Sequence, residues 1–184
     1  MKLNYTSILT AATLMLAAGN ANANMVWDLY AGGTAGFGGM AFTFDEHHAD
    51  WSAQSYGAVF GVDLPVVRFE AEYDYLTSDK IDMQLAMGNA YVKLLGAGII
   101  NPYIGVGIGM LLDTESDHYK YKDADIDPTI AYQGMLGATL NIPAIPFKID
   151  IEGRTLYIPE IYSIAKKDVN AFQYDARVKL RYIF

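Results

Sequence analysis

The stretch Phe172–Phe184, FQYDARVKLRYIF, decides the fold because apolar residues alternate in it with polar or charged ones. Successive side chains of a strand leave opposite faces of the sheet, so this period of two predicts a β-strand. A membrane-spanning barrel turns its apolar face to lipid and its charges to the lumen, whereas a soluble sandwich buries the apolar face. Val66–Leu76 and Phe147–Tyr157 repeat the pattern. Together the three stretches favour the membrane barrel.

The first 23 residues have the composition of a secretory signal. Lys2 supplies a positive charge, Ile8–Ala18 is a short apolar run, and Ala21–Ala23 fits an A-x-A cleavage site. A spanning helix needs about 20 apolar residues, so this run is too short for a stable anchor. We predict a signal peptide at 1–23 and one outer-membrane barrel domain at 24–184; a retained interfacial helix is the alternative.

The composition excludes several classes of protein. The chain has no cysteine, so an exported fold would rely on no disulfide. Its formal net charge of −8 argues against nucleic-acid binding and against a basic membrane-surface patch. Fourteen tyrosines and eight phenylalanines are many for 184 residues. Aromatic girdles at the two interfaces of a membrane barrel require such residues.

Strand-like patterns can be placed in eight segments, joined alternately by short and long connections. The segments cover about 26–40, 53–64, 66–76, 82–97, 103–112, 130–142, 147–157 and the part of the chain after a 158–168 loop. Proline removes a donor from a strand ladder, and the prolines fall between the segments, as at Pro102 in a short turn and Pro159 beside a long loop. We therefore predict an all-β fold, an eight-stranded antiparallel up-and-down transmembrane β-barrel. A soluble lipocalin-like barrel is the alternative, and the charged faces argue against it.

Two segments have special features. In the fourth, Gln84 and Lys93 fall on opposite parities, so either one of them faces lipid or a bulge shifts the alternation. In the fifth, Gly105, Gly107 and Gly109 share one parity. We predict that these glycines face the lumen and leave room for large side chains from across it.

Two stretches give the chain its resemblance to a known family: Pro102–Gly109, PYIGVGIG, and Arg177–Phe184, RVKLRYIF. The chain resembles the OmpA-like and opacity-type small outer-membrane β-barrels (porin family outer membrane proteins) of Gram-negative bacteria. The resemblance implies short turns and both termini in the periplasm and long loops outside. It also implies an assembly signal at Tyr182 and Phe184, read by the outer-membrane assembly machinery.

The charged parities predict a lumen charge network. Near-equal numbers of both signs favour ion pairs, because an unpaired charge in a narrow lumen is very costly. The alternative is a selective pore lined by these charges, but eight strands leave an interior that side chains nearly fill. The predicted members are Asp28, Asp63, Arg68, Glu70, Glu72, Asp74, Lys148, Asp150, Glu152, Arg154, Asp175, Arg177, Lys179 and Arg181.

Aromatic residues are predicted to anchor the barrel at the two membrane interfaces, where amphipathic rings are favoured. Trp27 and Phe184 belong to the periplasmic interface. The predicted anchors of the outer interface are Tyr56, Tyr73, Tyr75, Tyr132, Tyr157 and Tyr174.

The long connections carry weaker candidates. Asp123, Asp125 and Asp127 have the one-three-five spacing of a calcium loop, without its glycine at position six or its glutamate at twelve. His47 and His48 lie among carboxylates and a serine, a combination used by lipid A-modifying barrels, but no base is clearly positioned beside a hydroxyl. We interpret both groups as solvated loop residues. We predict no catalytic residue, metal site or cofactor.

The expected role is structural or surface-interacting, in membrane integrity or adhesion, and the family resemblance implies it. A narrow porin-like channel is the alternative, and a lipid A-modifying enzyme is a more remote one. We expect a monomer in the Gram-negative outer membrane. Its expected partners are outer-membrane lipid and lipopolysaccharide, the assembly machinery and a host or surface ligand, with no nucleic acid.

Overall fold

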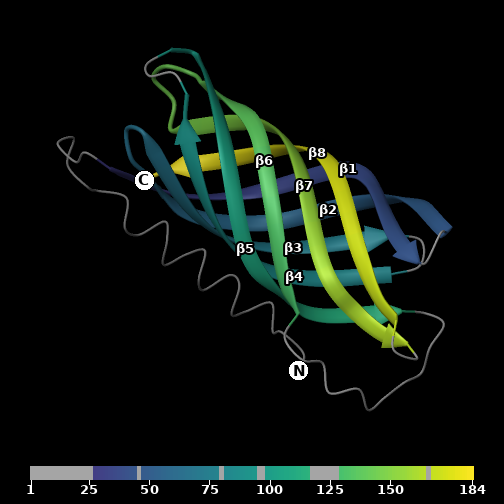
Figure 1. The fold of residues 1–184 in the computed structure, drawn as a ribbon. Coiled ribbons are helices and arrows are strands. Elements are labelled where there is room, and N and C mark those ends of the chain that lie inside the picture. The colour runs from purple at the N-terminus through teal and green to yellow at the C-terminus, as the bar shows by residue number, and fades with distance from the viewer. Residues whose placement is uncertain (1–26, 45–46, 79–80, 95–97, 117–128, 165–166) are drawn as a thin grey trace.

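A computed structural model describes residues 27–44, 47–78, 81–94, 98–116, 129–164 and 167–184 (Figure 1). The predicted signal peptide lies outside these residues. The described chain forms eight antiparallel strands, each paired with its neighbours in sequence, and β1 also pairs with β8 to close the barrel. This confirms the predicted eight-stranded up-and-down fold. The strands are β1 (Asp28–Phe44), β2 (His47–Asp63), β3 (Val67–Ser78), β4 (Ile81–Lys93), β5 (Ile100–Ser116), β6 (Ile130–Asn141), β7 (Phe147–Ile164) and β8 (Lys167–Ile183).

The two ends of the barrel differ in their connections. The links β2–β3, β4–β5 and β6–β7 lie at one end, together with the start of β1 and the end of β8 (left in Figure 1). We call this the turn end. We call the opposite end, toward which β1, β3, β5 and β7 run, the loop end. Among the described residues, no helix is long and apolar enough to cross a membrane.

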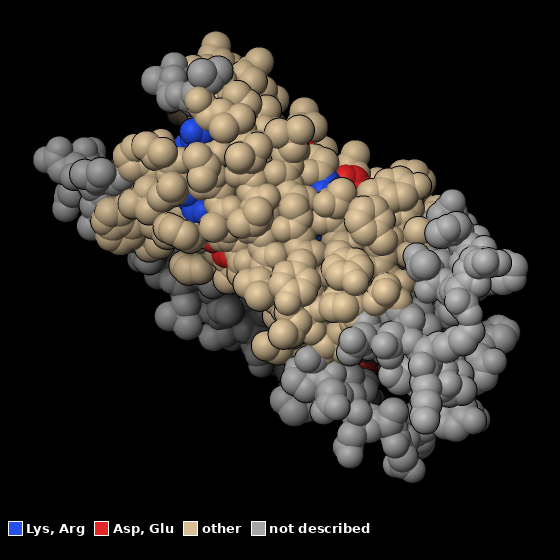
Figure 2. Space-filling model, in the orientation of Figure 1, with Lys and Arg blue, Asp and Glu red and all other residues tan. Residues whose placement is uncertain are grey.

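The alternation of the sequence becomes an alternation of burial. In β3, Arg68, Glu70 and Glu72 are buried in the barrel interior, while Phe69 and Tyr73 on the opposite face are 49% and 44% exposed. Strand β8 shows the same pattern from 171 to 181. The face of the wall in Figure 2 shows only isolated charged atoms between the two ends. Large apolar side chains such as Val106 and Leu136 are exposed on the wall and form an apolar band.

Several strands run further toward the loop end than the alternation predicts. β1 reaches Phe44 and β2 begins at His47, so the connection between the predicted segments 26–40 and 53–64 is mostly paired strand. β5 reaches Ser116, and β7 and β8 pair as far as Ile164 and Lys167. The loop assignments were therefore too long. Backbone pairing continues where side chains no longer alternate between apolar and charged, so a test of alternation ends too early.

Two prolines lie in strands and not in the predicted connections. Pro102 is near the start of β5, opposite Ala138. Pro159 lies in β7 where its register with β8 is irregular, between Ile158 and Tyr162. Strand starts and irregularities tolerate proline because a ladder donor is not required there.

The phase of β4 is resolved by its burial pattern. The odd-numbered residues from Met83 to Tyr91 are buried, so Lys93 shares the inward parity and Gln84 faces outward. The register shift in this part of the sheet places an extra residue, Leu112, on β5. The bulge therefore belongs to β5, and β4 keeps a single phase.

Candidate functional site

The barrel interior has two regions, and the first is a set of ion pairs that we call the charged network. It extends from the turn end toward the loop end, and its cations match its carboxylates in number. Its members are Asp63, Arg68, Glu70, Glu72, Asp74, Lys93, Lys148, Asp150, Glu152, Arg154, Asp175, Arg177, Lys179 and Arg181.

At the turn end, Asp63 and Asp150 pair with cations from four strands, β3, β4, β7 and β8. Arg181 places Nε 2.7 Å and Nη2 2.9 Å from the two oxygens of Asp150, a bidentate pair. Arg68 Nη1 lies 3.1 Å from the same carboxylate. Asp63 accepts from Lys148 at 3.0 Å and pairs with Lys93. Bidentate, charge-assisted bonds are the strong form of such pairs.

In the middle, Glu70 is surrounded by donors. Lys179 Nζ lies 2.5 Å from Glu70 Oε1, and the hydroxyls of Tyr30 and Tyr91 donate to the same carboxylate at 2.7 and 2.9 Å. The guanidinium carbon of Arg68 lies 3.9 Å from the centre of the Tyr91 ring. A cation over an aromatic face gains electrostatic attraction, which adds to its ion pair.

Nearer the loop end, two arginines link β3 with β7 and β8. Arg154 pairs with Asp74 and places Nη2 2.5 Å from Asp175 Oδ2. Arg177 pairs with Glu72, and its Nε lies 3.1 Å from Glu152 Oε1. These side chains are almost fully buried. Their charges are tolerable only because each is matched by a partner at contact distance.

The structure places the predicted lumen residues in this network with one exception. Asp28 begins β1 at the turn end, its side chain is 50% exposed, and its nearest cation, Lys148, is 3.9 Å away. Asp28 therefore lies at the rim and not within the lumen, because the barrel wall ends there. Lys93, whose direction the sequence left open, joins the network through Asp63.

Sequence reasoning missed the neutral polar residues of the interior. Tyr103 donates to Glu152 at 2.9 Å, and its ring packs edge-on to Tyr91 with 5.4 Å between centroids. Asn89 donates to Glu72 at 2.6 Å, and Gln133 donates to Asn89 at 2.6 Å. The inward parity of β4, read from its odd-numbered residues, would have found Asn89 and Tyr91.

The fifth-segment glycines adjoin these side chains. A β-carbon at Gly105 would collide with the Tyr91 ring, and one at Gly107 would collide with Asn89 Oδ1 and lie 2.7 Å from Gln133 Cγ. Protein interiors are close-packed, so large residues on one strand need small ones on the next. The glycines of β5 therefore make room for the large inward residues of neighbouring strands.

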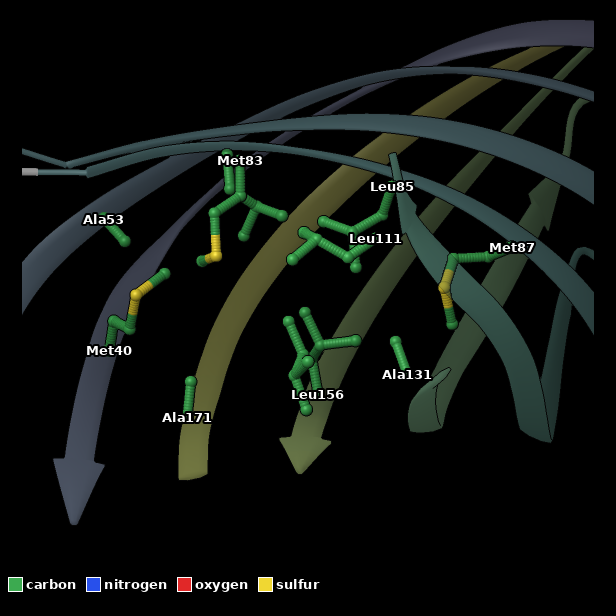
Figure 3. Packing of buried hydrophobic residues seen from close by; sticks show 11 residues of the cluster. Met40, Ala53, Met83, Leu85, Met87, Leu111, Ala131, Leu156 and Ala171 are labelled. Carbon is green, nitrogen blue, oxygen red and sulfur yellow. The ribbon is translucent and has the colours of Figure 1, made fainter. Parts of the chain in front are cut away.

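The second interior region lies nearer the loop end and is apolar, and the alternation of charged and apolar residues does not predict it. Side chains from different strands point toward one another in the interior (Figure 3). All are at most 5% exposed. We call them the apolar cluster: Met40, Ala53, Leu76, Met83, Leu85, Met87, Leu111, Ala131, Leu156, Ile158 and Ala171.

The change from charged to apolar inside occurs at the height of the predicted outer anchors. Ser55, inward and polar, precedes Tyr56 in β2, and Ala53 of the apolar cluster lies just beyond it. In β2 the outward residues beyond the same height are polar, as at Gln54 and Ser52. The two faces of β2 thus exchange their character at this level.

The predicted interface anchors face outward. Trp27 is 40% exposed at the turn end, and Phe184 packs against Tyr182 with 5.3 Å between ring centroids. Tyr75 is only partly exposed, and its hydroxyl donates to Asp82. The other tyrosines are 41% to 51% exposed: Tyr56, Tyr73, Tyr132, Tyr157 and Tyr174.

The remaining sequence candidates lie mostly outside the described residues. Asp123, Asp125 and Asp127 are not described. His47 and His48 begin β2, but their side chains are not described either. Among the described residues, no group of three histidine, cysteine, aspartate or glutamate side chains could hold a metal ion.

No protein-family model matches the chain, and no curated protein matches it in sequence. Solved structures match its fold. Neisserial surface protein A is 16% identical, with a TM-score of 0.60, over 83% of this chain and 96% of that one. The N-terminal β-barrel domain of Pseudomonas aeruginosa OprF is 12% identical, with a TM-score of 0.48, over 81% and 97% of the two chains. At these identities the likeness shows the fold alone.

Proposed function

We propose that this chain is an outer-membrane barrel with a structural or surface-interacting role and a closed interior. The single observation that carries the proposal is that two fillings lie in series inside it. The charged network occupies the part nearest the turn end, and the apolar cluster occupies the part nearest the loop end. An ion crossing the barrel would have to separate buried pairs and then pass a dry constriction, and both steps are costly.

The membrane location is supported by the outer wall. Apolar side chains stand exposed around it, including Phe37 at 63%, Val106 at 68% and Leu136 at 63%. Lipid covers such a band, and a closed barrel leaves no backbone edge unpaired within it. In this proposal the turn end faces the periplasm and the loop end faces outward, where the strands continue beyond the outer anchors.

A closed, rigid barrel supports its outer end mechanically. The apolar cluster gives the loop end its own hydrophobic core, so the strands stay paired beyond the predicted outer interface as far as Phe44 and Ile164. We infer that this outer section holds the connections at the cell surface, where adhesion or membrane integrity would depend on them. No cofactor or catalytic group is part of the proposal.

Single-channel recording in planar bilayers tests the closed interior. We expect the purified protein to show no stable open level under conditions in which an open general porin, recorded as a positive control, conducts steadily. A reproducible open level in the wild-type chain would favour the narrow-channel alternative. Mass spectrometry of lipid A from cells with and without the protein tests the enzyme alternative, and an altered acylation pattern would replace the structural role.

A further inference from the structure

The outer wall has a hollow in its apolar band. Its volume is about 680 Å³. Small residues form the floor, Ala71 on β3 with Gly88 and Ala90 on β4. Phe69 and Ile108 stand on either side, 49% and 56% exposed. An apolar chain lying in the hollow would contact both floor and sides.

Polar side chains border this wall toward the loop end. Gln84 lies four residues from Gly88 on the same face of β4, which is about 13 Å along the strand. Each outward tyrosine of this sector donates a hydrogen bond to a polar side chain nearer the loop end. The bonds are Tyr56 to Gln54 at 2.7 Å, Tyr73 to Gln84 at 2.8 Å and Tyr75 to Asp82 at 2.8 Å.

The opposite sector has a different character. Tyr132, Tyr157 and Tyr174 face outward there, and no side-chain hydrogen bond joins them to any described residue. We call the hydrogen-bonded side chains Gln54, Gln84 and Asp82, with their tyrosines, the polar rim; they lie on β2, β3 and β4, directly beyond the hollow. This asymmetry distinguishes one sector of the wall from a general membrane interface.

The rim can donate hydrogen bonds to a ligand. In Gln54 and Gln84 the tyrosine occupies the amide oxygen, and the amide nitrogen has no partner among the described residues. Each amide nitrogen carries two N–H donors. Phosphate and sugar oxygens are suitable acceptors for them. The ligand that fits is thus an amphiphile with an apolar chain and an oxygen-rich head about 13 Å away along the strand.

We propose that this sector binds lipid A of lipopolysaccharide, with an acyl chain in the hollow and the sugar oxygens of the disaccharide against Gln54 and Gln84. The inference rests on the proposed orientation, which places the rim in the outer leaflet of the outer membrane. Lipopolysaccharide is the oxygen-rich amphiphile of that leaflet. An acyl chain of ordinary length spans the distance from rim to hollow.

Two variants test the two parts of the site. Gly88→Phe fills the hollow, and the backbone accepts a side chain there, since a β-carbon would lie 3.7 Å from Ile108 O. Gln84→Leu removes rim donors. Each protein is inserted into nanodiscs with equal lipid A and phosphatidylglycerol, extracted in mild detergent and examined by native mass spectrometry. We expect wild type to retain lipid A preferentially and each variant to retain at least fivefold less.

Matched controls lie outside the sector. Gly33→Phe adds the same side chain to β1, where a β-carbon would lie 3.7 Å from Gly57 O. Thr155→Val removes a polar group from the exposed face of β7. Both controls should retain as much lipid A as wild type. Heat-modifiable gel migration verifies that every variant is folded.

The possible outcomes test the binding site and the membrane location separately. An equal loss of retained lipid A in Gly33→Phe and Gly88→Phe would overturn the hollow as the binding site. Equal retention of phosphatidylglycerol by wild type would overturn lipid A as its ligand. A wild-type chain that fails to insert into nanodiscs would overturn the proposed location, and the site with it.

Discussion

The same eight strands line two interior regions that are held together by opposite means. In the charged network, Arg177 and Asp150 are buried among counter-charges. In the apolar cluster, Leu85 and Leu156 are equally buried among methionines and aliphatic residues. What differs is the medium proposed to surround the wall. Inward and outward residues alternate. Where lipid covers the outer face, the inward residues are polar, and where water covers it, the inward residues are apolar.

The two regions differ in how each stabilises the barrel. Removing one partner of an ion pair in the charged network lowers the free energy of unfolding strongly, because the other partner becomes an uncompensated buried charge. A residue of the apolar cluster contributes through burial and packing, so its removal costs transfer free energy and leaves a cavity. In the charged network, replacing the second partner as well should therefore restore part of the free energy of unfolding, and in the apolar cluster a second truncation should not.

The largest effect is expected from Lys179→Met, which leaves Glu70 buried without its cation. We expect a loss of about 3–5 kcal/mol in the free energy of unfolding, measured by urea titration in lipid vesicles. Adding Glu70→Gln should recover at least half of that loss, because the isolated charge is removed. If the double variant were as unstable as the single one, the network would not be held by charge matching.

The apolar cluster should respond to a single truncation. Leu156 is 1% exposed, and Leu156→Ala should cost about 3 kcal/mol through lost burial and a cavity. Its control is Leu180→Ala on the outer wall, where Leu180 is 49% exposed and lipid fills the space. Urea titration of both variants sharpens the comparison. Equal losses would mean that the interior at this level is loosely packed.

A smaller effect is expected from overpacking next to the charged network. Gly107→Ala would push a methyl group into Asn89 and Gln133, and we expect a loss of about 1–3 kcal/mol. Gly134→Ala is the matched control, because its β-carbon would lie at an ordinary 3.4 Å from Thr155 Oγ1. Thermal unfolding followed by circular dichroism distinguishes them. An unchanged midpoint for Gly107→Ala would show that the polar side chains can move aside.

The smallest effect on stability is expected outside both regions. Deleting Phe184 removes a ring contact with Tyr182 and the backbone hydrogen bond from Phe184 N to Leu29 O, a loss of about 1–2 kcal/mol. If the terminal aromatic is an assembly signal, the same deletion should reduce the amount of folded barrel in the outer membrane severalfold. Heat-modifiable migration of membrane fractions measures this amount. Normal insertion of the shortened chain would contradict the assembly signal.

The sequence predicted the closed fold and most of the charged network, because both follow from a strict period of two. Arg177, Lys179 and Arg181 share one parity in a strand with no bulge, so their inward direction could be read directly. The partners of each cation could not be read, since Lys179 meets Glu70 from β3 across a curved interior. Pairing across a barrel depends on tilt and register, which local pattern does not fix.

The apolar cluster was missed for a different physical reason. An alternating pattern predicts which residues face the interior only if the inward residues keep the same polarity along the whole strand. Leu76 follows the inward acids of β3 on the same parity, and taken alone it looks like the end of the pattern. Met83 and Leu85 lie in β4, whose phase the sequence does not fix. The outward direction of Gln84 is not fixed by the sequence for the same reason.

The order of the strands along the chain has a consequence for biogenesis. Three carboxylates of β3, Glu70, Glu72 and Asp74, are synthesised early, and their counter-ions on β7 and β8 come at the end of the chain. An incomplete chain would carry those acids toward lipid without neutralisation. We therefore expect chains that lack β7 and β8 not to insert into the membrane. Insertion would then require the complete barrel, because β7 and β8 neutralise the acids of β3.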